Sequence, residues 1–150
     1  MKTILLLCGI LVHSIVGLAQ QIPSEEVPPL AFLALQKQYP AASKVQWNRI
    51  HGLYEVHFVV GDDEHELRYR DNGDLDATVT AIETSALPAP IRQWLATRYP
   101  DLNFCKAAKV VNAASGEMTY EAEVCESSLR SIIAFTPEGK ELRRPHKIRK

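Results

Sequence analysis

Residues 87–100, LPAPIRQWLATRYP, repeat the pattern of residues 27–40, VPPLAFLALQKQYP, at an offset of sixty positions. Each stretch has a hydrophobic residue and a proline, then ten residues, then a Tyr-Pro pair. Proline is tolerated in the first turn of a helix, whereas the residue before a proline avoids the α conformation. Each stretch therefore predicts one short helix, over residues 28–38 and 88–98.

The segment after each predicted helix has the pattern of antiparallel strands. Alternate positions from Tyr54 to Val60 are hydrophobic, which places them on one face of a strand. The Asn72-Gly73 pair is typical of a two-residue hairpin turn, because both positions accept positive φ angles. The predicted strands cover residues 44–50, 53–60, 64–70 and 75–82 in the first half, and 104–113, 117–126, 129–136 and about 140–143 in the second.

These elements predict an α+β fold, built as a tandem repeat of one helix plus a four-stranded antiparallel meander. The helix covers one face of its sheet and leaves the other face open. A unit of about sixty residues is small for independent stability, so we expect the two sheets to join or to pack together. The predicted organisation is a signal peptide (1–19), a short polar leader (20–26), a first repeat (27–84), a second repeat (85–144) and a basic tail (145–150).

The first nineteen residues have the features of a secretory signal peptide. Lys2 precedes an apolar run over residues 4–18, and Gly17 and Ala19 provide the small residues of a cleavage site. The apolar run is short for a membrane span, and no second such run follows it. We therefore expect a periplasmic or secreted protein with no membrane span after cleavage. A formal net charge of −1 gives no reason to expect a nucleic acid as a partner.

Two cysteines remain after cleavage, Cys105 and Cys125, in a compartment that permits disulfides. A hairpin centred on Ser115 places Cys105 directly opposite Cys125, within the reach of a disulfide. The same register in the first half places Val45 opposite Val59. The sequence therefore predicts a Cys105–Cys125 disulfide, and the alternative is two free buried thiols.

That register also pairs Trp47 with His57, and Arg49 with Glu55, on the face away from the helix. An aromatic side chain flanked by charges has the composition of a recognition surface. We therefore predict a partner-binding site formed by Trp47, Arg49, Glu55 and His57. The alternative interpretation is that Trp47 has a packing role under the other repeat or the tail.

Motifs for catalysis are absent from the sequence, which contains no G-x-S-x-G, HExxH, CxxC, glycine-rich phosphate loop or EF-hand loop. We therefore predict no enzyme activity, no catalytic residues and no cofactor. His51, His57 and His65, with the acidic residues around them, form one local group of metal-ligand types. A solvated acidic turn is the preferred interpretation of this group, so no metal site is predicted.

The doubled Pro-x10-Tyr-Pro pattern, with Trp47 after the first copy, the YEVHF stretch at residues 54–58 and a glycine turn, resembles the PepSY-like family, also called β-lactamase-inhibitor-like. The resemblance covers about residues 27–143. It implies a secreted or periplasmic protein of the kind frequent in Bacteroidetes, with a helix-plus-sheet repeat and a non-enzymatic binding or inhibitory role. Ala107 stands in the second copy where a counterpart of Trp47 is expected.

The leading functional prediction is a binding protein that uses its open sheet face to dock or inhibit a protein partner, such as an envelope peptidase or hydrolase. One alternative is a module that handles a small ligand or a metal in the envelope. Another is a structural envelope component whose sheets pair with other copies. The sequence leaves the identity of the partner and the oligomeric state open.

Overall fold

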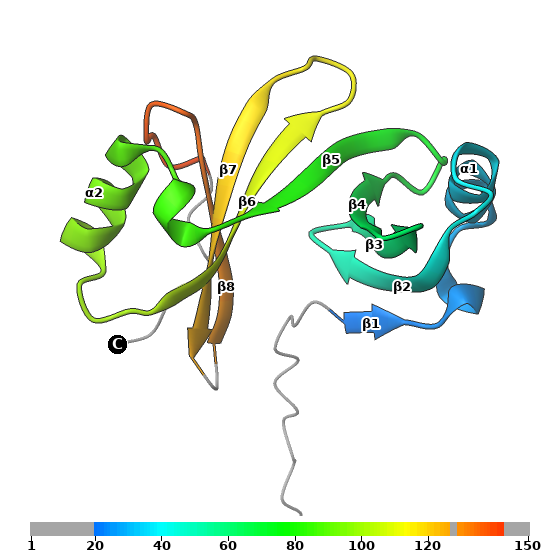
Figure 1. Ribbon diagram of the computed structural model, residues 1–150, viewed down its shortest axis with the longest axis horizontal. Helices are drawn as coiled ribbons and strands as arrows, with labels where there is room; N and C mark the ends of the chain where they lie inside the picture. Colours follow the sequence, from blue (N-terminus) through cyan, green and yellow to red (C-terminus); the bar gives the residue numbers. More distant parts are fainter. Residues whose placement is uncertain (1–19, 127–128, 143–150) are drawn as a thin grey trace, which may run out of the picture.

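The computed structural model describes residues 20–126 and 129–142, which form one curled antiparallel sheet with two helices. The helices are α1 (Pro29–Gln38) and α2 (Ala89–Arg98), each preceded by a short 3-10 turn, η1 (Ser24–Glu26) or η2 (Thr84–Ala86). The strands are β1 (Gln20–Ile22), β2 (Ser43–Ile50), β3 (Leu53–Val60), β4 (Asp63–Tyr69), β5 (Leu75–Ile82), β6 (Phe104–Asn112), β7 (Met118–Glu126) and β8 (Leu129–Phe135). All eight strands pair in chain order, and the two helices lie at opposite ends of the molecule (Figure 1).

The prolines and the Tyr-Pro pairs set the helix ends as predicted. Pro28 and Pro88 precede the first helical residues. The backbone N–H groups of Tyr39 and Tyr99 donate the last helical hydrogen bonds, both at 2.8 Å. The α+β class and the seven longer predicted strands are therefore confirmed. The predicted strand near residues 140–143 is wrong, because residues 140–142 form only an isolated bridge between Phe135 and Glu141.

The polar leader differs from the prediction, because residues 20–22 form strand β1. This strand pairs with β2, and Ile22 lies opposite Trp47. Ile82 of β5 and Ala107 of β6, which come sixty positions after Ile22 and Trp47, also lie opposite each other. Strand β5 therefore has the same place before α2 that β1 has before α1. The pairing of β5 with β6 joins the two halves into one sheet.

The hairpin between β2 and β3 has a different register from the predicted one. Trp47 pairs with Val56, and Arg49 pairs with Tyr54. The cause is the turn, in which His51 and Gly52 both have positive φ angles, 49° and 83°. These two residues form a two-residue loop, so the hairpin is centred between them and not on Gly52. The register changes by one residue, and a change of one residue moves a side chain to the other face of the sheet.

Trp47 consequently lies on the helix-covered face, and its predicted place on the open face is wrong. Its side chain is 1% exposed and packs in the core beneath α1, with its ring 6.1 Å from that of Tyr69. This first core contains Ile22, Val27, Ala31, Leu35, Trp47, Tyr54, Val56, Phe58, Leu67 and Tyr69. A second core beneath α2 contains Leu87, Ile91, Leu95, Ala107, Ala122, Ile133 and Phe135.

The cysteine hairpin is also irregular. Phe104 pairs with Val124 and Lys106 with Glu123, so the chain bulges at Cys105. The expectation that Cys105 stands directly opposite Cys125 is therefore wrong in register. A bulge lies at the matching place in the first half, where Ser43, and not Val45, pairs with Val59. The side chain of Cys125 lies outside the described residues, so the Cys105–Cys125 disulfide stays a prediction.

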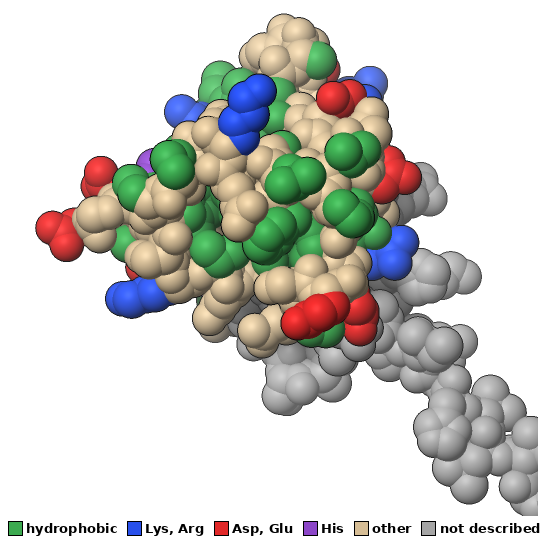
Figure 2. Space-filling model, turned by 90° about the vertical axis from the view of Figure 1, so that its right-hand side faces the viewer, with side chains coloured by type: hydrophobic (Ala, Val, Ile, Leu, Met, Phe, Trp, Pro, Cys, Tyr) green, Lys and Arg blue, Asp and Glu red, His purple; other side chains and the backbone are tan. Residues whose placement is uncertain are grey.

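Both helices cover the same face of the continuous sheet, and its other face, which we call the open face, lies between the two halves (Figure 1). On the outer surface at the α1 end, hydrophobic side chains gather, and Leu30 and Leu33 of α1 are exposed there (Figure 2). In the described part of the chain, no helix is long and apolar enough to cross a membrane. The predicted signal peptide (1–19) and basic tail (145–150) lie outside the described residues.

Candidate functional site on the open face

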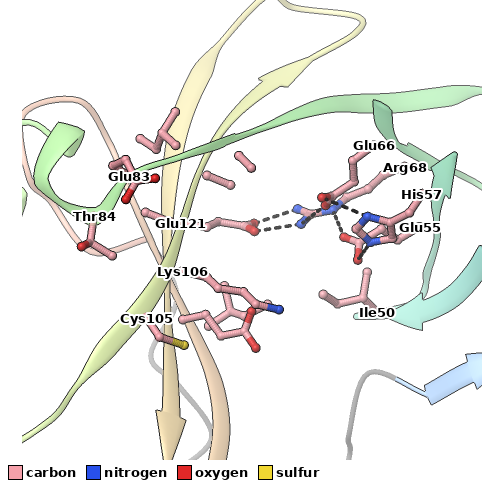
Figure 3. A pocket seen from close by; sticks show the side chains of 16 residues that line it. Ile50, Glu55, His57, Glu66, Arg68, Glu83, Thr84, Cys105, Lys106 and Glu121 are labelled. Carbon is pink, nitrogen blue, oxygen red and sulfur yellow. Dashed lines mark hydrogen bonds and ion pairs between the residues drawn. The ribbon is translucent and has the colours of Figure 1, made fainter. Parts of the chain in front are cut away.

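Five charged or titratable side chains meet on the open face, and we call them the open-face cluster: Glu55, His57, Glu66, Arg68 and Glu121 (Figure 3). Glu55 and His57 alternate along β3, and Glu66 and Arg68 alternate along β4. Alternate residues of a strand share a face, and His57 is directly opposite Glu66 in the β3–β4 pairing. Glu121 reaches the group from β7, in the other half of the chain.

Arg68 lies at the centre of the cluster and connects the two halves. Its Nε donates to Glu55 Oε2, and its Nη1 and Nη2 donate to the two oxygens of Glu121, all at 2.8 Å. Two strands, β5 and β6, separate β4 from β7 in the sheet. A contact across them requires the sheet to curl around the open face. The paired, charge-assisted hydrogen bonds fix the guanidinium in one orientation.

His57 lies between two carboxylates. Its Nε2 is 3.3 Å from Glu55 Oε1, and its Nδ1 is 3.4 Å from Glu66 Oε2. The imidazole is 43% exposed, whereas the side chains of Glu55 and Arg68 are 8% and 9% exposed. The cluster thus has a buried, rigid part and a part that faces the solvent.

The contacts shift the pKa values of Glu55 on β3 and Glu66 on β4 in opposite directions. Burial acts to raise the pKa of Glu55, but the hydrogen bond with His57 and the Arg68 guanidinium outweigh it and lower that pKa to about 2. Burial, together with the negative charge of Glu55, raises the pKa of Glu66 to about 7. The hydrogen bond to Glu55 raises the pKa of His57 above its ordinary value, against the effect of burial. Glu66 therefore exchanges its proton near neutral pH, and His57 keeps its proton to a higher pH than an ordinary histidine.

A pocket of about 210 Å³ opens beside the cluster, between the two halves of the sheet (Figure 3). Its lining includes Ile50, Glu83 and Lys106 together with the cluster. Pockets for drug-sized ligands usually measure roughly 300–1,000 Å³. This pocket is smaller, and its size suits an ion, a few water molecules or one side chain of a partner.

The structure divides the predicted partner-binding residues between the two faces of the sheet. Glu55 and His57 are on the open face, as predicted. Trp47 is buried on the other face, and Arg49 lies on that face too, with its guanidinium carbon 5.5 Å from the centre of the Tyr54 ring. The predicted set does not form one surface, because the register of β2 is changed by one residue.

Sequence reasoning missed Arg68 and Glu121, and it considered Glu66 only within the group of histidines and acidic residues that it interpreted as a solvated turn. The alternation along β4 places Glu66 and Arg68 beside His57 and Glu55, so a strand-by-strand comparison of faces could have found them. The pair Tyr120-Glu121 repeats the pair Tyr54-Glu55, and this repeat is a second sequence signal, which points to Glu121. The curl that brings Arg68 to Glu121 has no such signal, because it depends on the pairing of β5 with β6.

The histidines do not gather as the sequence suggested. His65 is on the opposite face of its strand from Glu66 and stacks on Phe58, with ring centroids 5.2 Å apart. His51 is in the β2–β3 turn and exposed. The structure instead brings Glu55, His57 and Glu66 together, with one ligand-type atom of each within 4.8 Å of the others.

The fold and the site define a class of protein: a curled antiparallel sheet with helices on its outer side and a charged open face. No family model matches the chain, and no curated protein matches it. Several solved structures of similar fold match the chain. A protein of Bacteroides eggerthii named as periplasmic is 22% identical, over 79% of this chain and 88% of that chain, with a TM-score of 0.56.

Two further structures have the same architecture. A DUF2874 family protein of Bacteroides uniformis is 22% identical, over 79% of this chain and 88% of its own, with a TM-score of 0.55. A BLIP-like protein of Bacteroides fragilis is 17% identical, over 81% and 87% of the two chains, with a TM-score of 0.50. The predicted resemblance to β-lactamase-inhibitor-like proteins is therefore confirmed for the fold.

Proposed function

We propose that the chain is a secreted or periplasmic binding protein without catalytic activity, and that it docks a protein partner on the open face of its sheet. The observation that carries this proposal is the open-face cluster, a set of charges held in place by Arg68 on the face that neither helix covers. Charges fixed before binding favour specificity, because the partner does not have to order them.

The exposed part of the open face, beside the pocket, supports docking. His57 and Lys106 remain accessible to solvent beside the buried charges of Glu55 and Arg68. The small pocket would receive one side chain of the partner. Of the residues predicted for partner binding, Glu55 and His57 keep that role in the proposal. Trp47 and Arg49 are on the other face, and the docking surface does not include them.

The names of the similar structures support the same class of function. One is called BLIP-like and another periplasmic. For this chain, we infer a location in the periplasm or outside the cell, a cleaved signal peptide over residues 1–19, and a partner such as an envelope peptidase or hydrolase. We also infer that the docked protein inhibits this partner.

Two finer structural features belong to the proposal. We infer that the halves are copies of one unit, because α1 and α2 begin and end sixty residues apart and the pairs Ile22–Trp47 and Ile82–Ala107 match at the same offset. We also infer a Cys105–Cys125 disulfide. Its closure of a loop of about twenty residues would stabilise the second half by roughly 2–4 kcal/mol. Alkylation of the intact protein followed by mass spectrometry should find neither thiol modified.

The docking proposal is tested with a charge reversal on the open face. Lys106→Glu changes an exposed side chain at the pocket, and Arg92→Glu changes an exposed side chain on α2 as the matched control. Each purified variant captures proteins from an envelope extract, and each captured protein is then purified and titrated against all three forms. We expect a partner whose affinity falls at least tenfold with Lys106→Glu and stays unchanged with Arg92→Glu.

The opposite pattern would contradict docking on the open face. If every purified partner binds the Lys106→Glu variant as tightly as the original protein, the contact lies elsewhere. If Arg92→Glu alone weakens the binding, the outer surface of α2 is the docking surface.

A further inference from the structure

We propose that Glu55, His57 and Glu66 form a binding site for a divalent transition-metal ion. The ligand-type atoms of these three side chains all lie within 4.8 Å of one another. They come from two adjacent strands, β3 and β4, so the sheet holds their backbones in place. The site does not depend on the proposed docking of a protein partner.

The hydrogen bonds of Arg68 leave the required oxygens free for a metal. Arg68 Nε binds Glu55 Oε2, and Arg68 Nη2 is 3.9 Å from Glu66 Oε1. The oxygens that face His57 are the other two, Glu55 Oε1 and Glu66 Oε2. Arg68 therefore orients the Glu55 carboxylate from behind, as groups around a metal site orient its ligands, and places its positive charge near Glu66.

His57 has a suitable position in this arrangement. One ring nitrogen would bind the ion in place of its present contact with a carboxylate oxygen, at 3.3 Å or 3.4 Å. The imidazole is half exposed, so it can rotate to bring the ligands to the separation of roughly 3.3 Å that tetrahedral bonds of 2.0–2.1 Å require.

The charges of the cluster balance when the ion is bound. A divalent cation is neutralised by Glu55 and Glu66, and Arg68 is neutralised by its paired hydrogen bonds to Glu121. The guanidinium thus does not leave an excess of positive charge beside the ion. The pocket adjoining the cluster gives room for water as the remaining ligand.

The kind of ligand selects the kind of metal. Ca²⁺ and Mg²⁺ prefer six or more oxygen ligands, and this site offers an imidazole nitrogen and two carboxylates. Imidazole together with carboxylate suits Zn²⁺ and its neighbours in the first transition row. Zn²⁺ is therefore the probe.

The experiment is a calorimetric titration of the chelator-treated protein with ZnCl2, supported by native mass spectrometry for the stoichiometry. His57→Ala removes the imidazole, and Glu66→Gln removes one anionic ligand while keeping the side-chain size. His51→Asn is the control, because it removes an exposed histidine from a turn position that Asn accepts readily. We expect one Zn²⁺ per chain, at least tenfold weaker binding in His57→Ala and in Glu66→Gln, and unchanged binding in His51→Asn.

The absence of saturable Zn²⁺ binding in the original protein would overturn the proposal. Binding of equal affinity in Glu66→Gln would do so as well, even if His57→Ala failed to fold. A loss of affinity in His51→Asn alone would move the metal to the β2–β3 turn and would also overturn the assignment.

Discussion

At the residue scale, Trp47 is the largest buried side chain beneath α1, and its removal tests the corrected register. Trp47→Ala leaves a cavity in the first core, so we expect the free energy of unfolding to fall by about 3–5 kcal/mol. That loss is a large part of the total stability of an ordinary domain, about 5–15 kcal/mol. Urea denaturation followed by circular dichroism measures it.

Trp47→Phe is the matched comparison. Within the described part of the chain, the buried indole N–H of Trp47 has no hydrogen-bond partner. The substitution to Phe removes this polar group and keeps an aromatic ring, so we expect it to cost less than half as much as Trp47→Ala. A loss below about 0.5 kcal/mol for Trp47→Ala would indicate a surface position and would contradict the buried one.

The titration of the open-face cluster predicts how stability depends on pH. The pKa of Glu66 is raised to about 7, so its stabilising contribution is complete below about pH 4.5 and is lost as the pH rises through 7. The pKa of His57 is also raised, and its contribution is lost in the same direction. The pKa of Glu55 is lowered to about 2, so its contribution is present above about pH 4.5 and is lost as the pH falls. The metal-free protein should be most stable at mildly acidic pH.

Glu66→Gln separates these contributions. We expect the free energy of unfolding of the chelator-treated protein to fall by about 1–3 kcal/mol between pH 5 and pH 8. In Glu66→Gln, this decrease should be at most half as large. Urea denaturation at a series of pH values measures both. Glu64→Gln, an exposed carboxylate on the same strand, is the control and should leave the profile unchanged. A profile that is identical in Glu66→Gln would refute the assignment to Glu66.

At the element scale, a glycine turn packs beneath the first turn of each helix. A Cβ atom added at Gly73 would lie 2.7 Å from the carbonyl oxygen of Leu30 in α1, and one added at Gly139 would lie 2.9 Å from Pro90 Cβ in α2. Both glycines have positive φ angles, 85° and 87°. These turns therefore fix the distance between each helix and its sheet.

Gly73→Ala tests this contact. Gly61 also has a positive φ angle, 64°, but an added Cβ would meet no atom within 4 Å, so Gly61→Ala has the backbone cost alone. We expect Gly61→Ala to lower the free energy of unfolding by about 1 kcal/mol and Gly73→Ala to lower it by about 2–4 kcal/mol. Thermal and urea denaturation measure the difference. Equal losses would mean that the turn does not contact α1.

The elements that the sequence predicted well are those with local signals. The proline positions define α1 and α2, and alternating hydrophobic residues define β3. Strand β1 has only the residues Gln20, Gln21 and Ile22, which show no alternation, and its conformation depends on pairing with β2. The face of Trp47 was missed because a two-residue turn and a three-residue turn at His51-Gly52 differ by one residue in register.

At the scale of the whole molecule, the pairing of β5 with β6 turns two small sheets into one, with six pairs from Ala77–Asn112 to Ile82–Ala107. The sequence leaves open whether the sheets join or stack, because either arrangement buries apolar surface. Only the joined arrangement gives the curl that brings β4 and β7 across the open face. The cluster is therefore a property of the whole chain. Its residues on β3 and β4 can be predicted from their alternation, whereas the contact of Arg68 with Glu121 cannot.

The contact between Arg68 and Glu121 joins segments 53 residues apart, so it should stabilise the curl of the joined sheet. Glu121→Gln leaves the buried guanidinium half paired, and we expect it to lower the free energy of unfolding by about 1–3 kcal/mol. Glu117→Gln, at an exposed position near the β6–β7 turn, is the control and should change it by less than about 0.5 kcal/mol. Arg68→Met should abolish the effect of Glu121→Gln in the double variant, because the two substitutions remove one interaction. Additive losses in the urea denaturation of the double variant would mean that the two halves are stabilised independently, and that the curl is determined by the pairing of β5 with β6 alone.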